Sequence, residues 1–224
     1  KPTEPQIKDE NGKTGWDVIS DELALAQNGD TVVVDMNGTT KIPKSVLEDI
    51  EGRNIDLVLD MGSGITWTIN GETVTNPKAV DLRVSKNVKR IPVNVIDNVT
   101  GDNFNMEISL AHNGEFGFEA MLTITLGRKY NDCYANLYYY NPSDKAMEFI
   151  DCDLIANGNA QLVFNHASDY AIVIDEEALG DDVSSAAGVT AESEVMENDA
   201  SVSVVFALPL VLAAGFVIRK KLCR

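Results

Sequence analysis

Three residues of the types used in nucleophilic catalysis lie within four positions of each other: His166, Ser168 and Asp169. In a hydrolase the serine attacks, the histidine takes its proton, and the carboxylate orients the histidine. The three residues of a catalytic triad come from separate segments of the chain. Neighbouring residues on one strand point to opposite faces or follow one another along the strand, so they cannot form such a relay. We therefore expect a structural role for them in a turn before the last strand. The sequence predicts no catalytic residue and no enzymatic activity.

Metal-binding and cofactor-binding patterns are equally weak. The second histidine, His112, lies in a predicted turn, and the two histidines are far apart in the sequence, so no zinc-ligand spacing is present. The segment DNVTGDN (97–103) offers Asp97, Asp102 and asparagine oxygens to calcium. It lacks the EF-hand order, and turns have the same composition. We predict no metal ion and no cofactor.

Two cysteines flank a predicted hairpin whose turn centres near Ser143 and Asp144. The residue numbers of Cys133 and Cys152 sum to 285, close to the value of about 287 expected for residues opposed across that turn. A cross-strand disulfide between Cys133 and Cys152 is one interpretation. Two half-buried thiols that stay reduced are the other.

Aromatic side chains supply a candidate binding surface. In a strand over 134–141, Tyr134, Tyr138 and Tyr140 fall on one face, and Leu137 and Tyr139 on the other. Trp67 lies in the alternating segment ITWTI. If exposed, Trp67, Tyr138 and Tyr140 could stack on sugar rings and form a glycan-binding site. If buried, they are core aromatics, which is the more frequent outcome.

The elements that must position these residues change character along the chain. Residues 14–80 have the pattern of a small α+β element: helices over 15–26 and 44–51, strands over 31–35, 54–61 and 64–69, and a hairpin signal at Asn70-Gly71. From residue 81 to 174 short strands recur between turn clusters, as in an antiparallel β-sandwich. The expected strands are 80–85, 90–96, 105–111, 120–127, 133–140, 148–155, 160–165 and 170–175. The predicted fold is mainly β, and the pattern is compatible with one domain or with two.

Both ends of the chain have a non-globular composition. Residues 1–13 contain Pro2 and Pro5 among polar residues and are typical of the end of a linker, which suggests a longer protein upstream. Residues 175–199 contain nine acidic residues and no basic one, so we expect an extended acidic tether. Residues 200–218 carry no charge and match the thickness of a bilayer in helical form.

The charges suggest an orientation for that segment. Residues 219–224 contribute +4 to a net charge of −17, leaving −21 for residues 1–218. The basic residues Arg219, Lys220, Lys221 and Arg224 favour the cytoplasmic side. We therefore expect a single-pass transmembrane helix that contacts membrane lipid, with the N-terminus outside and Cys223 reduced in the cytoplasm. The negative surface disfavours nucleic-acid binding.

Several segments resemble the membrane-proximal C-terminal module of Gram-positive extracellular surface proteins. They are SGITWTINGETV (63–74), SLAHNGEFGFEAMLTITLG (109–127), YANLYYYN (134–141) and HASDYAIVID (166–175). The resemblance covers about residues 14–175 and the tail, and implies display on the cell surface without naming an activity. The tail also resembles a sortase sorting signal but lacks its motif, because Asn198, Asp199, Ala200 and Ser201 stand in its place. A retained membrane helix is favoured over attachment to the cell wall.

These patterns favour two functions. The first is a non-enzymatic stalk that anchors and displays an upstream domain on the outer face of the cell membrane. The alternative is an adhesive module that binds a cell-wall or host glycan or protein through exposed aromatics. Exposure of Trp67, Tyr138 and Tyr140 discriminates between them, because a contiguous exposed aromatic patch supports binding and full burial supports the stalk.

Overall fold

A computed structural model describes residues 4–10 and 12–179. The predicted acidic tether beyond Leu179, the membrane segment 200–218 and the basic tail 219–224 lie outside these residues. Within the described part, no helix is both long and apolar enough to cross a membrane.

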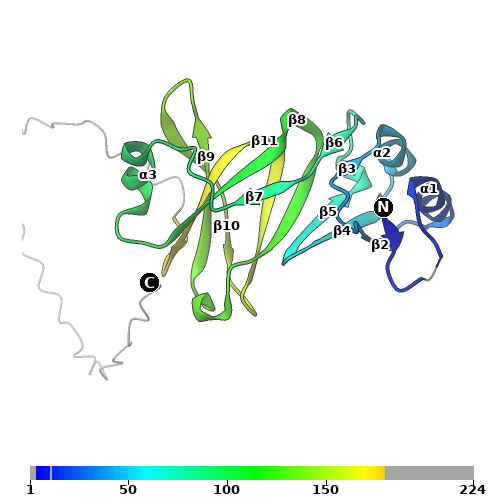
Figure 1. The fold of residues 1–224 in the computed structure, drawn as a ribbon, viewed down its shortest axis with the longest axis horizontal. Coiled ribbons are helices and arrows are strands. Elements are labelled where there is room, and N and C mark those ends of the chain that lie inside the picture. The colour runs from blue at the N-terminus through cyan, green and yellow to red at the C-terminus, as the bar shows by residue number, and fades with distance from the viewer. Residues whose placement is uncertain (1–3, 11, 180–224) are drawn as a thin grey trace, which may run out of the picture.

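The structure is mainly β and contains few helices (Figure 1). The helices are α1 (Trp16–Leu25), α2 (Lys44–Ile50) and α3 (Val93–Thr100), with short 3-10 turns η1 (Gly71–Thr73) and η2 (Arg128–Tyr130). The strands of the first part are β1 (Gln6–Ile7), β2 (Thr31–Asp35), β3 (Lys41–Ile42), β4 (Asp56–Gly62), β5 (Ile65–Asn70), β6 (Val80–Asp81) and β7 (Val84–Lys86). Those of the second part are β8 (Asn105–Thr125), β9 (Tyr134–Asn141), β10 (Ala146–Leu154) and β11 (Asn159–Asp175).

One nine-stranded sheet runs through the whole body in the order β1-β2-β4-β5-β8-β11-β9-β10, with β7 on β8. β3 and β6 form a separate pair. Among the described strands, only β2 and β4 pair in parallel, because the connection between them passes through α2; the other pairings are antiparallel. The long strands β8 and β11 belong to both halves of the body. Residues 120–124 of β8 pair with β5, toward the α1/α2 end, and residues 170–175 of β11 pair with β9. β8 and β11 pair with each other along most of their length.

Alternation along the strands explains how the sheet buries one face. Val34, Leu59, Trp67, Leu122 and Leu162 are successive partners across five paired strands, and all five are buried. Cross-strand partners point to the same face of a sheet. Ile19 and Leu23 of α1 and Leu47 of α2 belong to the same core. That core extends from Ile7 to Ile174, so both parts of the chain share it.

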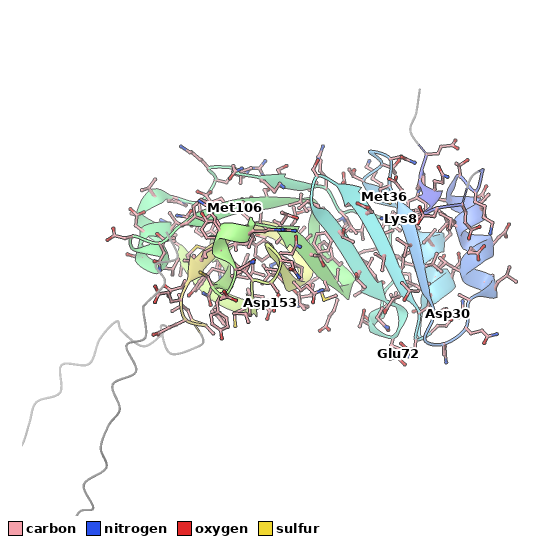
Figure 2. The ribbon with its side chains drawn as sticks, turned by 90° about the horizontal axis from the view of Figure 1, so that it is seen from below. Lys8, Asp30, Met36, Glu72, Met106 and Asp153 are labelled. Carbon is pink, nitrogen blue, oxygen red and sulfur yellow. The ribbon has the colours of Figure 1, made fainter. Side chains whose placement is uncertain are left out.

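The two ends of the body are distinct (Figure 1). β1, α1 and α2 lie at one end, and α3 lies at the other, against β10 and β11. β11 finishes at the α3 end, where the Ile174 N–H donates to the Phe104 carbonyl at 2.9 Å. Figure 2 shows the same separation, with Lys8 and Met36 at one end and Met106 and Asp153 in the other half. The described chain therefore enters at one end and leaves at the other.

Several predicted elements differ from the observed ones. The segment 90–96 is not the expected strand, because Pro92 caps helix α3. Asn70-Gly71 does not form a two-residue hairpin; Asn70 accepts a hydrogen bond from the Glu72 N–H and starts η1. The predicted turn at residues 112–117 lies inside β8, where Gly114 and Gly117 have positive φ angles of 81° and 82°. Strands 160–165 and 170–175 are likewise one strand, β11.

Candidate functional site

Two of the three aromatic candidates are inaccessible. Trp67 is 0 % exposed, its Nε1–H donates to the Leu82 carbonyl at 3.0 Å, and its ring meets Phe164 edge-on with centroids 5.5 Å apart. Tyr138 is 3 % exposed and packs edge-on against Phe149. Neither ring is available to stack on a sugar. The candidate binding surface of Trp67, Tyr138 and Tyr140 is therefore absent from the described structure, and the alternative of core aromatics holds for Trp67 and Tyr138.

Tyr140 is half-buried because α3 covers this side of the sheet. Ile91, Val95 and Ile96 form a small second core with Ala171, and Tyr140 and Met147 pack against it. Arg90 attaches the segment that leads into α3 to strand β8, because its Nη1 donates a hydrogen bond to Ser109 Oγ at 2.9 Å. The sequence signal for this cover was the Pro92 that precedes VNVI, which also opens a helix.

The residues His166, Ser168 and Asp169 are not in a turn but inside β11, and they do not form a relay. His166 Nδ1 donates to the Asn165 amide oxygen at 2.9 Å, and its ring lies edge-on to Tyr139 with centroids 4.8 Å apart. Asp169 faces Arg90 instead, with 3.6 Å between Oδ1 and Nη1. Strand irregularities at Phe164/His166 and Ala167/Asp169 separate the two side chains along β11.

Of the two interpretations left open, the disulfide between Cys133 and Cys152 is wrong, because Cys152 is a free thiol. The pairing of β9 with β10 explains why. Cys152 lies opposite Asn136, whereas the Cys133 carbonyl accepts the N–H of Ile155 at 2.8 Å. The two cysteines are thus offset by three positions, partly through an irregularity at Ile150. Burial, together with the neighbouring carboxylates of Asp151 and Asp153, raises the pKa of the Cys152 thiol.

A polar groove of about 550 Å³ lies where the loop after η1 crosses the middle of β8. Its lining includes Thr73, Thr75 and Asn76 from the loop, Glu115 and Glu119 from β8, and Asn165 from β11. Gly117 makes the crossing possible. Its carbonyl accepts the N–H groups of Thr75 at 2.9 Å and Asn76 at 3.1 Å, and a Cβ at this position would collide with the Asn76 backbone.

The groove has the chemistry of a hydrogen-bonding surface. Glu115 and Glu119 are exposed, and neither belongs to an ion pair within the described residues. On the adjoining side, the buried Tyr170 hydroxyl donates to the His166 carbonyl at 2.9 Å. Burial, and then the neighbouring Tyr139 and Glu115, raises the pKa of Tyr170. The groove offers carboxylate and amide oxygens as acceptors to a ligand.

His112 lies in β8 rather than in a turn, beside a second cavity of about 370 Å³ between β6 and β8. Burial, and then the positive charge of Lys78, lowers the pKa of His112, while a hydrogen bond with the Glu115 backbone and the charge of Asp81 oppose this shift. Its Nε2 is buried and has no hydrogen-bond partner among the residues that the structure describes. In the part of the chain that the structure describes, no three His, Cys, Asp or Glu side chains gather as metal ligands. Asp97 lies in α3, not in an open loop.

Sequence reasoning missed the site that fixes the end of the globular body. Asn136 of β9 is fully buried, and its Oδ1 accepts the Leu179 N–H at 2.7 Å. Its Nδ2 donates to the Glu177 carbonyl at 3.2 Å and lies 3.5 Å from the Val173 carbonyl. Residues 175–179, predicted as the start of the acidic tether, are therefore attached to the body. Buried polar groups are hydrogen-bonded, but the partners of Asn136 are distant in the sequence, so no local pattern indicated them.

No family model, curated protein or solved structure matches this chain. Its function therefore has to be inferred from its own residues.

Proposed function

We propose that this chain is a non-enzymatic stalk module that displays an upstream domain outside the cell and is retained by a membrane helix over residues 200–218. The observation that carries the proposal is the path of the chain through the body. Residues near β1 enter at one end of the sheet, and β11 leaves at the other. A module with this path holds an upstream domain and a downstream anchor at opposite ends of the body.

The connection at the exit supports the same proposal. Asn136 holds the backbone at Glu177 and Leu179, so the acidic segment begins from a fixed point on β9. The composition of the segment up to Asp199 favours an extended chain, because nine carboxylates without a basic partner repel each other. Beyond it come an uncharged stretch and a cluster of +4, in the order expected of an outside-to-inside anchor.

We also propose that the module has a sandwich-like fold joined to a transmembrane helix. It would lie on the extracellular face of the cell membrane of a Gram-positive cell. The alternative function is glycan adhesion through exposed aromatic side chains. Trp67 and Tyr138 cannot serve in it, because both are buried. Adhesion would have to use another surface, such as the groove lined by Glu115 and Glu119.

Transfer of the tail to a secreted reporter tests the anchoring part of the proposal. Residues 175–224 fused to the reporter should move it from the medium to the membrane fraction of a Gram-positive host. A matched fusion with Leu210→Asp and Val211→Asp should return it to the medium, because two carboxylates at the centre of the segment oppose insertion. A reporter that stays in the medium with the unaltered tail would contradict the proposal.

A further inference from the structure

An apolar stripe crosses the outer face of the sheet, opposite the buried row of Trp67 and Leu59. Its members are cross-strand partners on five adjacent strands and therefore point to the same side. This outer stripe consists of Val33 on β2, Val58 on β4, Thr68 on β5, Met121 on β8 and Val163 on β11.

The outer stripe is not part of the protein's interior. The two hydrophobic cores of the described residues contain none of its apolar side chains. Val163 is 40 % exposed, and the others are half-buried by their sheet neighbours. Polar residues such as Thr66 and Thr123 occupy the next outward-facing row, as expected of a solvated face. Four apolar side chains in one row are an exception to that alternation, and contiguous exposed apolar surface is typical of interaction sites.

Carboxylates border the stripe on both sides. Asp35 and Asp60 are register partners on one side, and Asp56 and Glu119 lie on the other. Among the described residues, the one ion pair that these four carboxylates make joins Lys8 to Asp60 at 3.2 Å. Each border is two residues from the stripe along its strand, about 7 Å away. The face thus has an apolar centre and negative edges.

We propose that the outer stripe is a docking surface for a basic amphipathic helix of a partner protein. The stripe spans four inter-strand spacings, about 19 Å, which is the length of about 13 helical residues. Such a helix would place its apolar side on Val58 and Met121 and direct Lys or Arg side chains toward the carboxylates at both edges. A second copy of a chain with net charge −17 would meet like charges there, and so would an anionic lipid surface. This inference is independent of the proposed stalk function.

The test uses a chain ending at Asp199, which keeps both hydrophobic cores because they lie between residues 7 and 174. The probe is a synthetic helical peptide of about 18 residues, long enough to cover the stripe, with leucines on one side and lysines beside them. Its matched control has Glu in place of every Lys. Binding is followed through the methyl resonances of methionine: Met121 reports on the stripe, and Met106 and Met147 report on the other half of the body.

The expected result is a shift of the Met121 resonance with the lysine peptide and none with the glutamate peptide. Val58→Thr with Val163→Thr should weaken binding about tenfold, the effect of losing about 1.4 kcal/mol. Leu25→Ser with Val93→Thr, which changes exposed apolar residues elsewhere, should leave the affinity within about twofold. The unchanged resonance of buried Met36 shows that each variant is folded.

Four results would overturn the inference. They are equal binding of the glutamate peptide, equal weakening by the control pair, a response at Met106 or Met147 instead of Met121, and no response to the lysine peptide. A Met121 shift that depends on protein concentration without peptide would assign the stripe to self-association and would also overturn it.

Discussion

Removal of the Asn136 side chain should loosen the point where the chain leaves the globular body. The side chain is fully buried and holds Leu179 through a 2.7 Å hydrogen bond and Glu177 through a 3.2 Å hydrogen bond. Asn136→Ala removes both bonds. It also leaves partner groups of residues 177–179 without their buried acceptor and donor.

The cost can be estimated from these two bonds. A neutral hydrogen bond contributes about 1 kcal/mol net to stability, so the pair contributes about 2 kcal/mol. We neglect the third contact, to Val173, because 3.5 Å is at the limit of a hydrogen bond. Leu179→Pro removes only the donor of the shorter bond. In a double-mutant cycle, Asn136→Ala and Leu179→Pro should therefore couple by about 1 kcal/mol.

Urea unfolding of the chain ending at Asp199 measures these free energies. Leu179→Ala is the matched control, because it keeps the backbone N–H and should leave the stability within about 0.5 kcal/mol of the parent. The reasoning fails if Asn136→Ala also unfolds within about 0.5 kcal/mol of the parent, or if its effect is unchanged in the Leu179→Pro background.

Three further predictions concern the buried tryptophan, the histidine in β8 and the free thiol. Trp67→Ala should lower the free energy of unfolding by about 3–5 kcal/mol in urea titrations, because the side chain is fully buried; a loss below about 1 kcal/mol would mean that the ring is not core. The folded-state pKa of His112 is below its ordinary value of 6.5, so the unfolded chain binds the proton more tightly and stability should fall as the pH drops below 6.5. His112→Gln should remove that part of the pH dependence, and an unchanged slope between about pH 5 and 7 would contradict it. Without reductant, maleimide labelling and peptide mapping should find label on Cys152, increasing as the pH rises toward its raised pKa; a blocked Cys152 would restore the disulfide hypothesis.

The regular elements of the first part were predictable because their signals are local. Ile19 and Leu23 lie one turn apart on the apolar face of α1, and Pro43 precedes α2. The alternation in ITWTI directs Trp67 into the core. In each case the periodicity of one segment determined both its type and its buried face.

The errors arose where one local signal permits two structures. Glycines with positive φ suit a turn and a bulge equally, so Gly114 and Gly117 gave no indication that β8 continues through them. The β-branched run at Val93–Ile96 favoured a strand until packing against Ala171 selected a helix. The disulfide interpretation was wrong because Cys133 and Cys152 are offset by three positions in the register of β9 and β10. Residue spacing around a turn does not determine that register.

The candidate site was harder to predict than the fold. Burial of Trp67 depends on Phe116 and Phe164, burial of Tyr138 on Phe149, and the half-burial of Tyr140 on α3, and these are tertiary contacts. The outer stripe depends on the register of five strands that extend from β2 to β11, most of them distant in the sequence. The two Asn136 bonds join residues 41 and 43 positions apart, separations without a sequence signature.

The most direct test of the proposed function compares the full chain with a version ending at Asp199, both secreted by a Gram-positive host. The protein is quantified in the membrane, in the wall released by muramidase, and in the medium. Our account predicts that the full chain is in the membrane fraction and that truncation sends the protein into the medium. A truncated protein that remains on the wall would contradict it, because the globular body would then bind the surface itself.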